Sequence, residues 1–147
     1  MPRPNACRRL AITLLVVSAC TQPVPGVLTL APAGMRTTGT CTPHPNGTLT
    51  MAAPATAESE VYVDAGRVTV TVTAASADPD QPLSIELSFA GTNIGTSRVQ
   101  TSQPTAFPFH AQMRASGPVA IRLAVRNDAP APSPAMLDVE KVVITQP

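Results

Sequence analysis

Four side chains near the end of the 147-residue chain carry oxygen atoms that could bind a metal ion or a sugar. Asn127 and Asp128 precede a proline-rich loop, and Asp138 and Glu140 follow it, within the stretch LAVRNDAPAPSPAMLDVEKVVI at 123–144. Carboxylate and carbonyl oxygens are the ligands that calcium prefers. If the loop closes these residues around one point, they form a ligand or metal site; otherwise the loop only joins two strands.

The same four residues also have a purely structural interpretation. Asp138 and Glu140 alternate with apolar residues, so both point outward on one face of a strand, where they either line a site or form its solvated surface. Asn127-Asp128 is a good turn initiator, because these side-chain oxygens can bond to backbone amides. The residue types alone leave both interpretations open.

Other side chains offer little chemistry. His110 lies out of phase with its apolar neighbours, which predicts a surface position, and His44 lies in a loop, so the two histidines lack the spacing of zinc ligands. No serine sits in a nucleophile-elbow pattern, and no cysteine has the setting of a catalytic thiol. We therefore do not expect an enzyme, and calcium is the one cofactor that the residues suggest.

The N-terminus predicts export. The basic segment MPRPNACRRL is followed by the apolar run LAITLLVVSA at 10–19, which is shorter than the ~20 residues of a membrane-spanning helix. We therefore predict that residues 1–19 are a signal peptide. The Arg8-Arg9 pair is compatible with export by the twin-arginine route as well as by the general secretory route. Residues 20–27 are rich in Pro and Gly, as in a tether, and 28–147 remain for one domain.

The string Val17-Ser18-Ala19-Cys20 resembles the lipobox of bacterial lipoproteins. The resemblance implies that Cys20 carries a lipid and anchors the exported protein to the bacterial cell envelope. The alternative is an ordinary cleavage site with an incidental cysteine. Loss of Cys7 and acylation of Cys20 would leave Cys41 as an unpaired thiol, whereas an unmodified Cys20 could form a disulfide with Cys41.

Composition narrows the classes of partner. Removal of residues 1–19 would leave seven basic and nine acidic residues, a formal charge of −2. Nucleic acid is therefore disfavoured as a partner, because its phosphates are negatively charged. Aromatic residues make up 3% of the chain, with no Trp and Tyr62 as the single Tyr, so few side chains can stack on a ligand.

Alternation of apolar and polar residues predicts an all-β fold. Turn-forming residues separate the alternating runs, which indicates an antiparallel jelly-roll β-sandwich, galactose-binding-like, of eight or nine strands. Two segments after residue 27 have compositions that suggest disorder, 32–47 and 129–134, and Asn46-Gly47 predicts a hairpin turn. In the final run the apolar residues Val142 and Ile144 are one position out of phase with Leu137 and Val139, which predicts a bulge near Lys141. The expected strands are 28–31, 48–53, 58–64, 68–74, 83–89, 94–100, 107–113, 119–125 and 137–144.

Four segments, VTVTVTAAS (68–76), PLSIELSFAGTNIGTSRVQ (82–100), AFPFHAQMRASGPVAIRLAVRNDA (106–129) and MLDVEKVVI (136–144), resemble the calcium-dependent xylan-binding carbohydrate-binding modules over about 75 residues. The resemblance places Asn127-Asp128 on the Asn-Asp of that family, and Glu140 on the acid of its last strand. The family's Asp-Arg-Asn, however, is replaced by Pro134-Ala135-Met136, which removes oxygen donors from the calcium cage.

Two functions follow from these observations. The first is an envelope-anchored lipoprotein whose β-sandwich binds a polysaccharide or other glycan. The second is a non-catalytic structural or protein-interaction lipoprotein with a degenerate sugar site and a protein partner.

Overall fold

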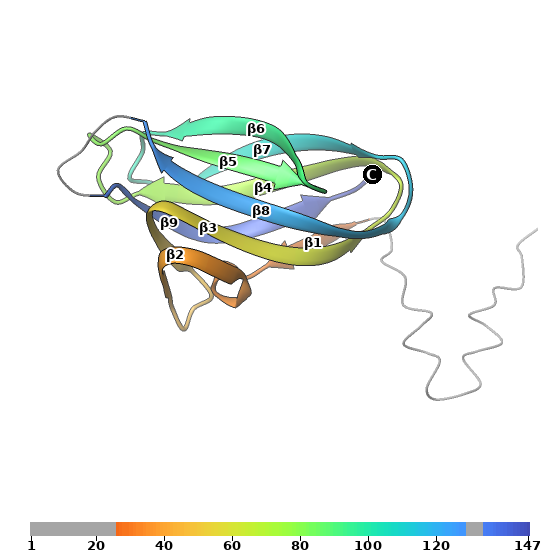
Figure 1. Ribbon diagram of the computed structural model, residues 1–147, viewed down its shortest axis with the longest axis horizontal. Helices are drawn as coiled ribbons and strands as arrows, with labels where there is room; N and C mark the ends of the chain where they lie inside the picture. The colour runs from red at the N-terminus through yellow and green to blue at the C-terminus, as the bar shows by residue number, and fades with distance from the viewer. Residues whose placement is uncertain (1–25, 129–133) are drawn as a thin grey trace, which may run out of the picture.

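The computed structural model describes residues 26–128 and 134–147, which form nine β-strands and one short 3-10 helix (Figure 1). Within these two ranges, no helix is long and apolar enough to cross a membrane. The predicted signal peptide, Cys20 and most of the tether lie outside the described residues. The elements are β1 (Val27–Leu30), η1 (Pro32–Gly34), β2 (Arg36–Pro43), β3 (Leu49–Val63), β4 (Gly66–Ser76), β5 (Leu83–Phe89), β6 (Thr92–Val99), β7 (Thr105–Met113), β8 (Gly117–Asn127) and β9 (Met136–Thr145).

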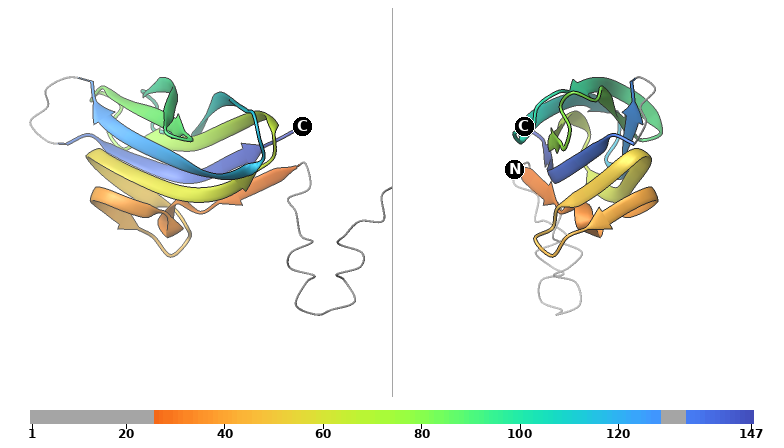
Figure 2. Two further views of the ribbon diagram at one scale, coloured as in Figure 1. Left: turned by 45° about the vertical axis from the view of Figure 1, so that its right-hand side comes forward. Right: turned by 90° about the vertical axis from the view of Figure 1, so that its left-hand side faces the viewer.

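The strands form two antiparallel layers that share β3. The hydrogen-bonded order is β6-β5-β8-β3-β9-β4-β7, with β1 beside β9 and β2 beside β3. Residues 49–52 of β3 pair with β9, whereas residues 55–63 pair with β8. Ala53 and Pro54 have no register partner in either ladder, and proline lacks the N–H that a ladder requires. At this point β3 passes from one layer to the other, and the end-on view in Figure 2 shows the two layers facing each other.

The core lies between the two layers and follows the predicted alternation. Along β5, Leu83, Ile85 and Leu87 are fully buried, and Leu123 of β8 and Val70 of β4 are buried in the same cluster. Burial of such aliphatic side chains stabilises the fold by about 1.5–3 kcal/mol each. Most polar residues of the strands consequently lie on the outer faces of the sandwich, whereas Ser76 and Ser84 are buried.

The predicted antiparallel sandwich is confirmed, and so is the bulge in the final strand. Thr73 of β4 pairs with Lys141, but the next residue, Ala74, pairs with Val139, so Glu140 is the extra residue. The Asn46-Gly47 hairpin turn is also present, because Gly47 has φ +91° and its N–H donates to the carbonyl of His44.

Two predictions about the N-terminal third were wrong. Residues 36–43, within the segment expected to be disordered, form strand β2, and the strands expected at 48–53 and 58–64 are one strand, β3. β2 buries little surface: all its residues are exposed except Cys41, which is half-buried and packs against the core. An edge strand of this kind lacks the alternating apolar pattern by which strands are identified. The proline-rich loop lies mostly outside the described residues, at 129–133.

Candidate functional site

Asn127 and Asp128, predicted as ligand-binding residues, hold the end of β8 in place. The Asn127 side-chain oxygen accepts a hydrogen bond from the N–H of Ala135, 3.1 Å away. The Asp128 carboxylate accepts the hydroxyl of Ser84 at 2.6 Å and forms an ion pair with Arg98 at 3.3 Å. Their oxygens thus tie β8 to β5, β6 and the start of β9.

Asp138 and Glu140 lie on the outer face of the other layer. The Thr50 hydroxyl donates to the Asp138 carboxylate at 2.6 Å, and His44 Nε2 lies 2.8 Å from the same hydroxyl. Because a threonine hydroxyl has one proton and a carboxylate only accepts, Nε2 of His44 must be the donor. These residues line a groove of about 830 Å³, named here the histidine groove, together with Pro45, Asn46, Thr48, Ala75, Ser102, Pro104, Val139 and Glu140.

The four predicted residues therefore occupy two different places. Asp138 and Glu140 line the histidine groove, whereas Asn127 and Asp128 line a separate pocket of about 390 Å³ together with Ser84, Glu86, Thr96 and Arg126. In the described part of the chain, no three His, Cys, Asp or Glu side chains are placed to hold a metal ion. Arg98 already supplies positive charge to Asp128. The described residues therefore do not fit a calcium cage, which requires six to eight oxygen ligands.

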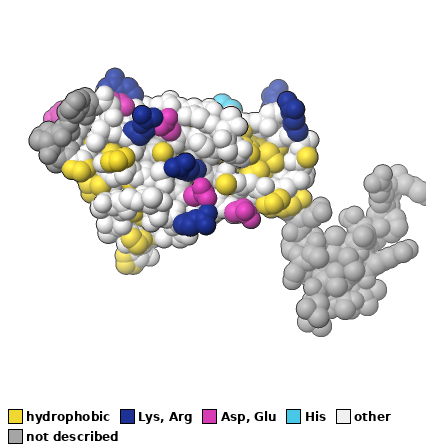
Figure 3. All heavy atoms as spheres, in the orientation of Figure 1, with side chains coloured by type: hydrophobic (Ala, Val, Ile, Leu, Met, Phe, Trp, Pro, Cys, Tyr) yellow, Lys and Arg dark blue, Asp and Glu magenta, His cyan; other side chains and the backbone are white. Residues whose placement is uncertain are grey.

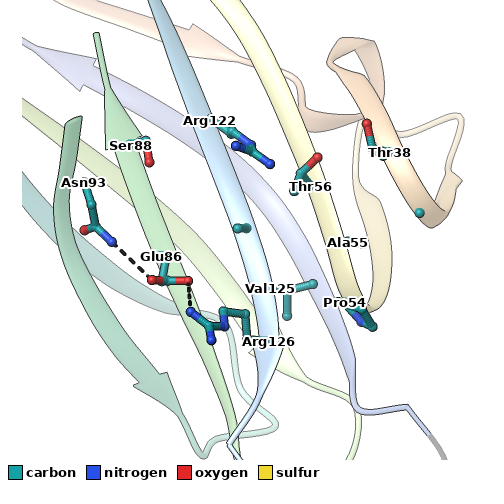
Figure 4. A pocket seen from close by; sticks show the side chains of 12 residues that line it. Thr38, Pro54, Ala55, Thr56, Glu86, Ser88, Asn93, Arg122, Val125 and Arg126 are labelled. Carbon is teal, nitrogen blue, oxygen red and sulfur yellow. Dashed lines mark hydrogen bonds and ion pairs between the residues drawn. The ribbon is translucent and has the colours of Figure 1, made fainter. Parts of the chain in front are cut away.

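A second groove crosses the outer face of the layer formed by β6, β5, β8, β3 and β2. Its floor follows one row of register partners, in which Glu86, Ala124, Thr56 and Thr38 lie side by side on four successive strands. Figure 4 shows these strands from close by. This groove, named here the arginine groove, has a volume of about 400 Å³ and is lined by Thr38, Gly39, Pro54, Ala55, Thr56, Glu86, Ser88, Asn93, Arg122, Ala124, Val125 and Arg126.

The walls of the arginine groove are two arginines of β8. Arg122 and Arg126 lie four residues apart on the same face of the strand, which separates their Cα atoms by about 13 Å. Ala124 lies between them and leaves the floor low. The groove is thus a trough between two long basic side chains.

Hydrogen bonds hold Arg126, one wall of the arginine groove, whereas Arg122, the other wall, has no such bond to the described residues. Asn93 donates to one oxygen of Glu86 at 3.1 Å, and Arg126 donates to the other at 2.8 Å. The hydrogen bond to Glu86 raises the pKa of the Arg126 guanidinium. In contrast, no hydrogen bond or ion pair from the Arg122 side chain occurs within the described residues. The lining carries two basic side chains and one acidic side chain, a net charge of +1.

The arginine groove was not predicted from the sequence. Alternation along the expected strand 83–89 is sufficient to place Glu86 and Ser88 on its outward face, but their neighbours across the sheet depend on register. Basic and acidic side chains lie next to one another on this face in Figure 3. The signal that could have identified the groove is the outward series Arg122, Ala124, Arg126, in which a small residue separates two arginines.

The remaining predicted residues are not part of either groove. Cys41 is half-buried and has no disulfide partner among the described residues, and burial raises the pKa of its thiol above the ordinary value for cysteine. His110 is exposed, as predicted, and contacts the Thr69 hydroxyl at 3.2 Å. Neither residue has the surroundings of a reactive group.

No family model matches this sequence, and no curated protein sequence matches it. Solved structures do match its fold. The CBM36-1 domain of a multidomain xylanase from the hindgut metagenome of Trinervitermes trinervoides has a TM-score of 0.68 at 16% identity, covering 82% of this chain and 98% of the domain. The carbohydrate-binding module CBM36 in complex with calcium and xylotriose has a TM-score of 0.64 at 17% identity, covering 81% of this chain and 98% of the module.

A third match extends the likeness to another group of modules. The C-terminal CBM6 of LamC, a marine laminarinase from Zobellia galactanivorans, has a TM-score of 0.62 at 14% identity, covering 82% of this chain and 99% of that domain. Identities this low establish the fold alone. The chain has the β-sandwich fold of the CBM36 and CBM6 carbohydrate-binding modules.

Proposed function

We propose that this chain is a non-catalytic polysaccharide-binding lipoprotein, anchored to the bacterial cell envelope through a lipid on Cys20, and that the arginine groove takes the glycan. The observation that carries the proposal is the form of this groove. It crosses several strands, and its polar walls are set on a rigid sheet. Its volume falls within the range of ligand sites in proteins.

The chemistry of the lining suits sugar hydroxyls. Glu86 and the two arginines offer acceptors and donors, and the hydroxyls of Thr38 and Thr56 supply both. Glu86 is already held by two hydrogen bonds, so little side-chain freedom is lost when it meets a ligand. A site of this kind binds a chain by hydrogen bonds along its length.

The arginine groove lacks one common means of binding sugars, an aromatic platform. No aromatic side chain lines the arginine groove. Tyr62 is on the same face of β3 as Thr56, but six residues further along, which is about 20 Å. Affinity without stacking must come from hydrogen bonds and charge, which favours a polymer that makes several weak contacts at once.

Groove-filling variants test the site. A polypeptide of residues 21–147 contains every described strand, and its retention by polysaccharides can be measured by affinity electrophoresis against a panel that includes xylan, mannan and laminarin. We expect Ala124→Phe to reduce retention by raising the groove floor. Ala120→Phe, on the same strand and face but outside the groove, is the matched control and should bind as the unmodified chain does.

The outcomes of this experiment separate the two functions. Equal retention of the Ala124 and Ala120 variants would exclude the groove as the site. Failure of the unmodified chain to bind any glycan of a broad panel would refute polysaccharide binding and favour the structural or protein-interaction role.

The lipid anchor has its own test. Cells that express the full chain are labelled with a fatty-acid probe and then fractionated. We expect label and membrane association to be lost in Cys20→Ser and retained in Cys41→Ser, which removes a cysteine outside the lipobox. Unchanged membrane association of the Cys20 variant would refute lipidation at this residue.

A further inference from the structure

We propose that the glycan bound in the arginine groove is anionic, and that Arg122 recognises a carboxylate group on it, as in a polymer that contains uronic acids. This inference rests on the proposed function, because it assigns a substrate class to the same groove. Three observations support it. Arg122 has no partner among the described residues, the neighbouring carboxylates already accept hydrogen bonds from other side chains, and the groove lining has a net positive charge.

Arg122 differs from the other arginines on this face. Arg36 forms an ion pair with Glu58 at 2.6 Å, Arg126 with Glu86 at 2.8 Å, and Arg98 with Asp128 at 3.3 Å. Arg122 is exposed and, among the described residues, its guanidinium has no partner. Figure 4 shows it beside Ser88 and Thr56 with no interaction drawn to it.

The carboxylates nearest in register are engaged elsewhere. Glu58 is the register partner of Arg122 on β3, but its Oε1 accepts from Arg36. Glu86 lies one row further along β5, and its two oxygens accept from Asn93 and Arg126. The five N–H donors of Arg122 are therefore left to solvent or to a ligand.

The chemistry of a free guanidinium selects the ligand. Its planar array of donors matches a carboxylate, which can accept two parallel hydrogen bonds, whereas a neutral sugar hydroxyl offers no charge. The groove lining has a net charge of +1, so a carboxylate brings the site to neutrality. Because no aromatic platform contributes, this charged contact is the strongest that the groove can make.

Two polymers that differ only in charge provide the test. The 21–147 polypeptide is titrated at low ionic strength with a glucuronic-acid-containing xylan and with the same polymer after reduction of its carboxyl groups. We expect the acidic polymer to bind roughly tenfold more tightly. Arg122→Gln should abolish this preference, and Arg122→Lys should restore part of it, because lysine keeps the charge but loses the paired donors.

A matched control is present on the opposite layer. Arg67 is exposed on β4 and has no ion pair within the described ranges, so Arg67→Gln removes the same charge without touching the groove. Its affinity for both polymers should equal that of the unmodified chain. Melting temperatures of all variants confirm that each is folded.

Failure of this inference is distinguishable from failure of the proposed function. Equal affinity for the acidic and the reduced polymer would overturn the inference and leave glycan binding intact. Binding to neither polymer, nor to the wider panel, would overturn both. Tighter binding of a sulfated polymer at equal charge density would refute the choice of a carboxylate, and an unchanged preference in Arg122→Gln would refute the role of Arg122.

Discussion

Replacement of Gly39 by alanine should destabilise the fold well beyond the usual cost of a surface substitution. Gly39 lies in β2 at the irregularity where pairing with β3 shifts register, and it has φ +88°. An added Cβ would lie 2.8 Å from the carbonyl oxygen of Pro54 and 3.1 Å from Cα of Ala55. Both contacts involve backbone atoms, so the neighbour cannot yield by changing a rotamer.

The magnitude follows from two separate terms. A residue with a Cβ in a left-handed backbone conformation costs about 1–2 kcal/mol. Forcing an atom into a packed site costs about 1–3 kcal/mol more. We therefore expect Gly39→Ala to lower the free energy of unfolding by about 2–5 kcal/mol, a large share of the 5–15 kcal/mol of a typical domain.

Urea unfolding of the 21–147 polypeptide measures this change. With a slope of about 2 kcal/mol per molar urea, the midpoint should fall by about 1–2.5 M. Gly34→Ala is the matched control, because Gly34 has an ordinary φ and no atom within 4 Å of its added Cβ. It should be neutral or slightly stabilising. A difference of less than about 1 kcal/mol between the two variants would refute the assigned backbone strain and close contact.

The Ser84 hydrogen bond, the Cys41 thiol and the response to calcium can each be tested in the same polypeptide. Ser84→Ala removes the hydroxyl that donates to the Asp128 carboxylate, and it should lower the free energy of unfolding in urea by about 1–2 kcal/mol. Ser88→Ala, on the same face of β5, should leave that free energy almost unchanged. Equal losses in the two variants would contradict the assigned role of this hydrogen bond. Burial raises the pKa of the Cys41 thiol, so less thiolate is present at pH 8 in the folded chain than in the unfolded chain. A disulfide reagent should therefore react with Cys41 faster after denaturant is added. Equal reaction rates with and without denaturant would count against burial of Cys41. Calcium should not raise the melting temperature, and a rise that Asp128→Asn abolishes would show that the oxygens near β8 do form a cation site.

Much of the fold could be predicted from the sequence because side-chain direction along a strand has a local period of two. Val70 and Leu87 could be placed in the core, and Glu86 on the surface, from their immediate neighbours alone. The bulge at Glu140 was predictable for the same reason, since an inserted residue shifts the phase of burial by one position. Strand β2 was not predicted, because it is an edge strand that buries little surface and therefore lacks the alternation of apolar and polar residues.

The candidate site was much less predictable. Asp128 and Asp138 flank one loop, and the sequence left open whether the two acids share a site; the structure gives Asp138 a hydroxyl partner, Thr50, that is 88 residues away in the chain. Proximity in sequence was a poor guide because β8 and β9 belong to different layers and β3 lies between them in the strand order. Asp138 therefore faces the histidine groove, whereas Asp128 faces a separate pocket beside β5.

The local pattern of residues was sufficient to predict an all-β sandwich, the inward-facing residues of most strands, the turn at Asn46-Gly47 and the late bulge. The predictions of export and of a lipid on Cys20 rest on the sequence alone. The ion pairs of Arg36 with Glu58 and of Arg126 with Glu86, and the absence of a partner for Arg122 among the described residues, are visible only in the folded chain. Those relations depend on register between strands far apart in the chain, which no local pattern encodes.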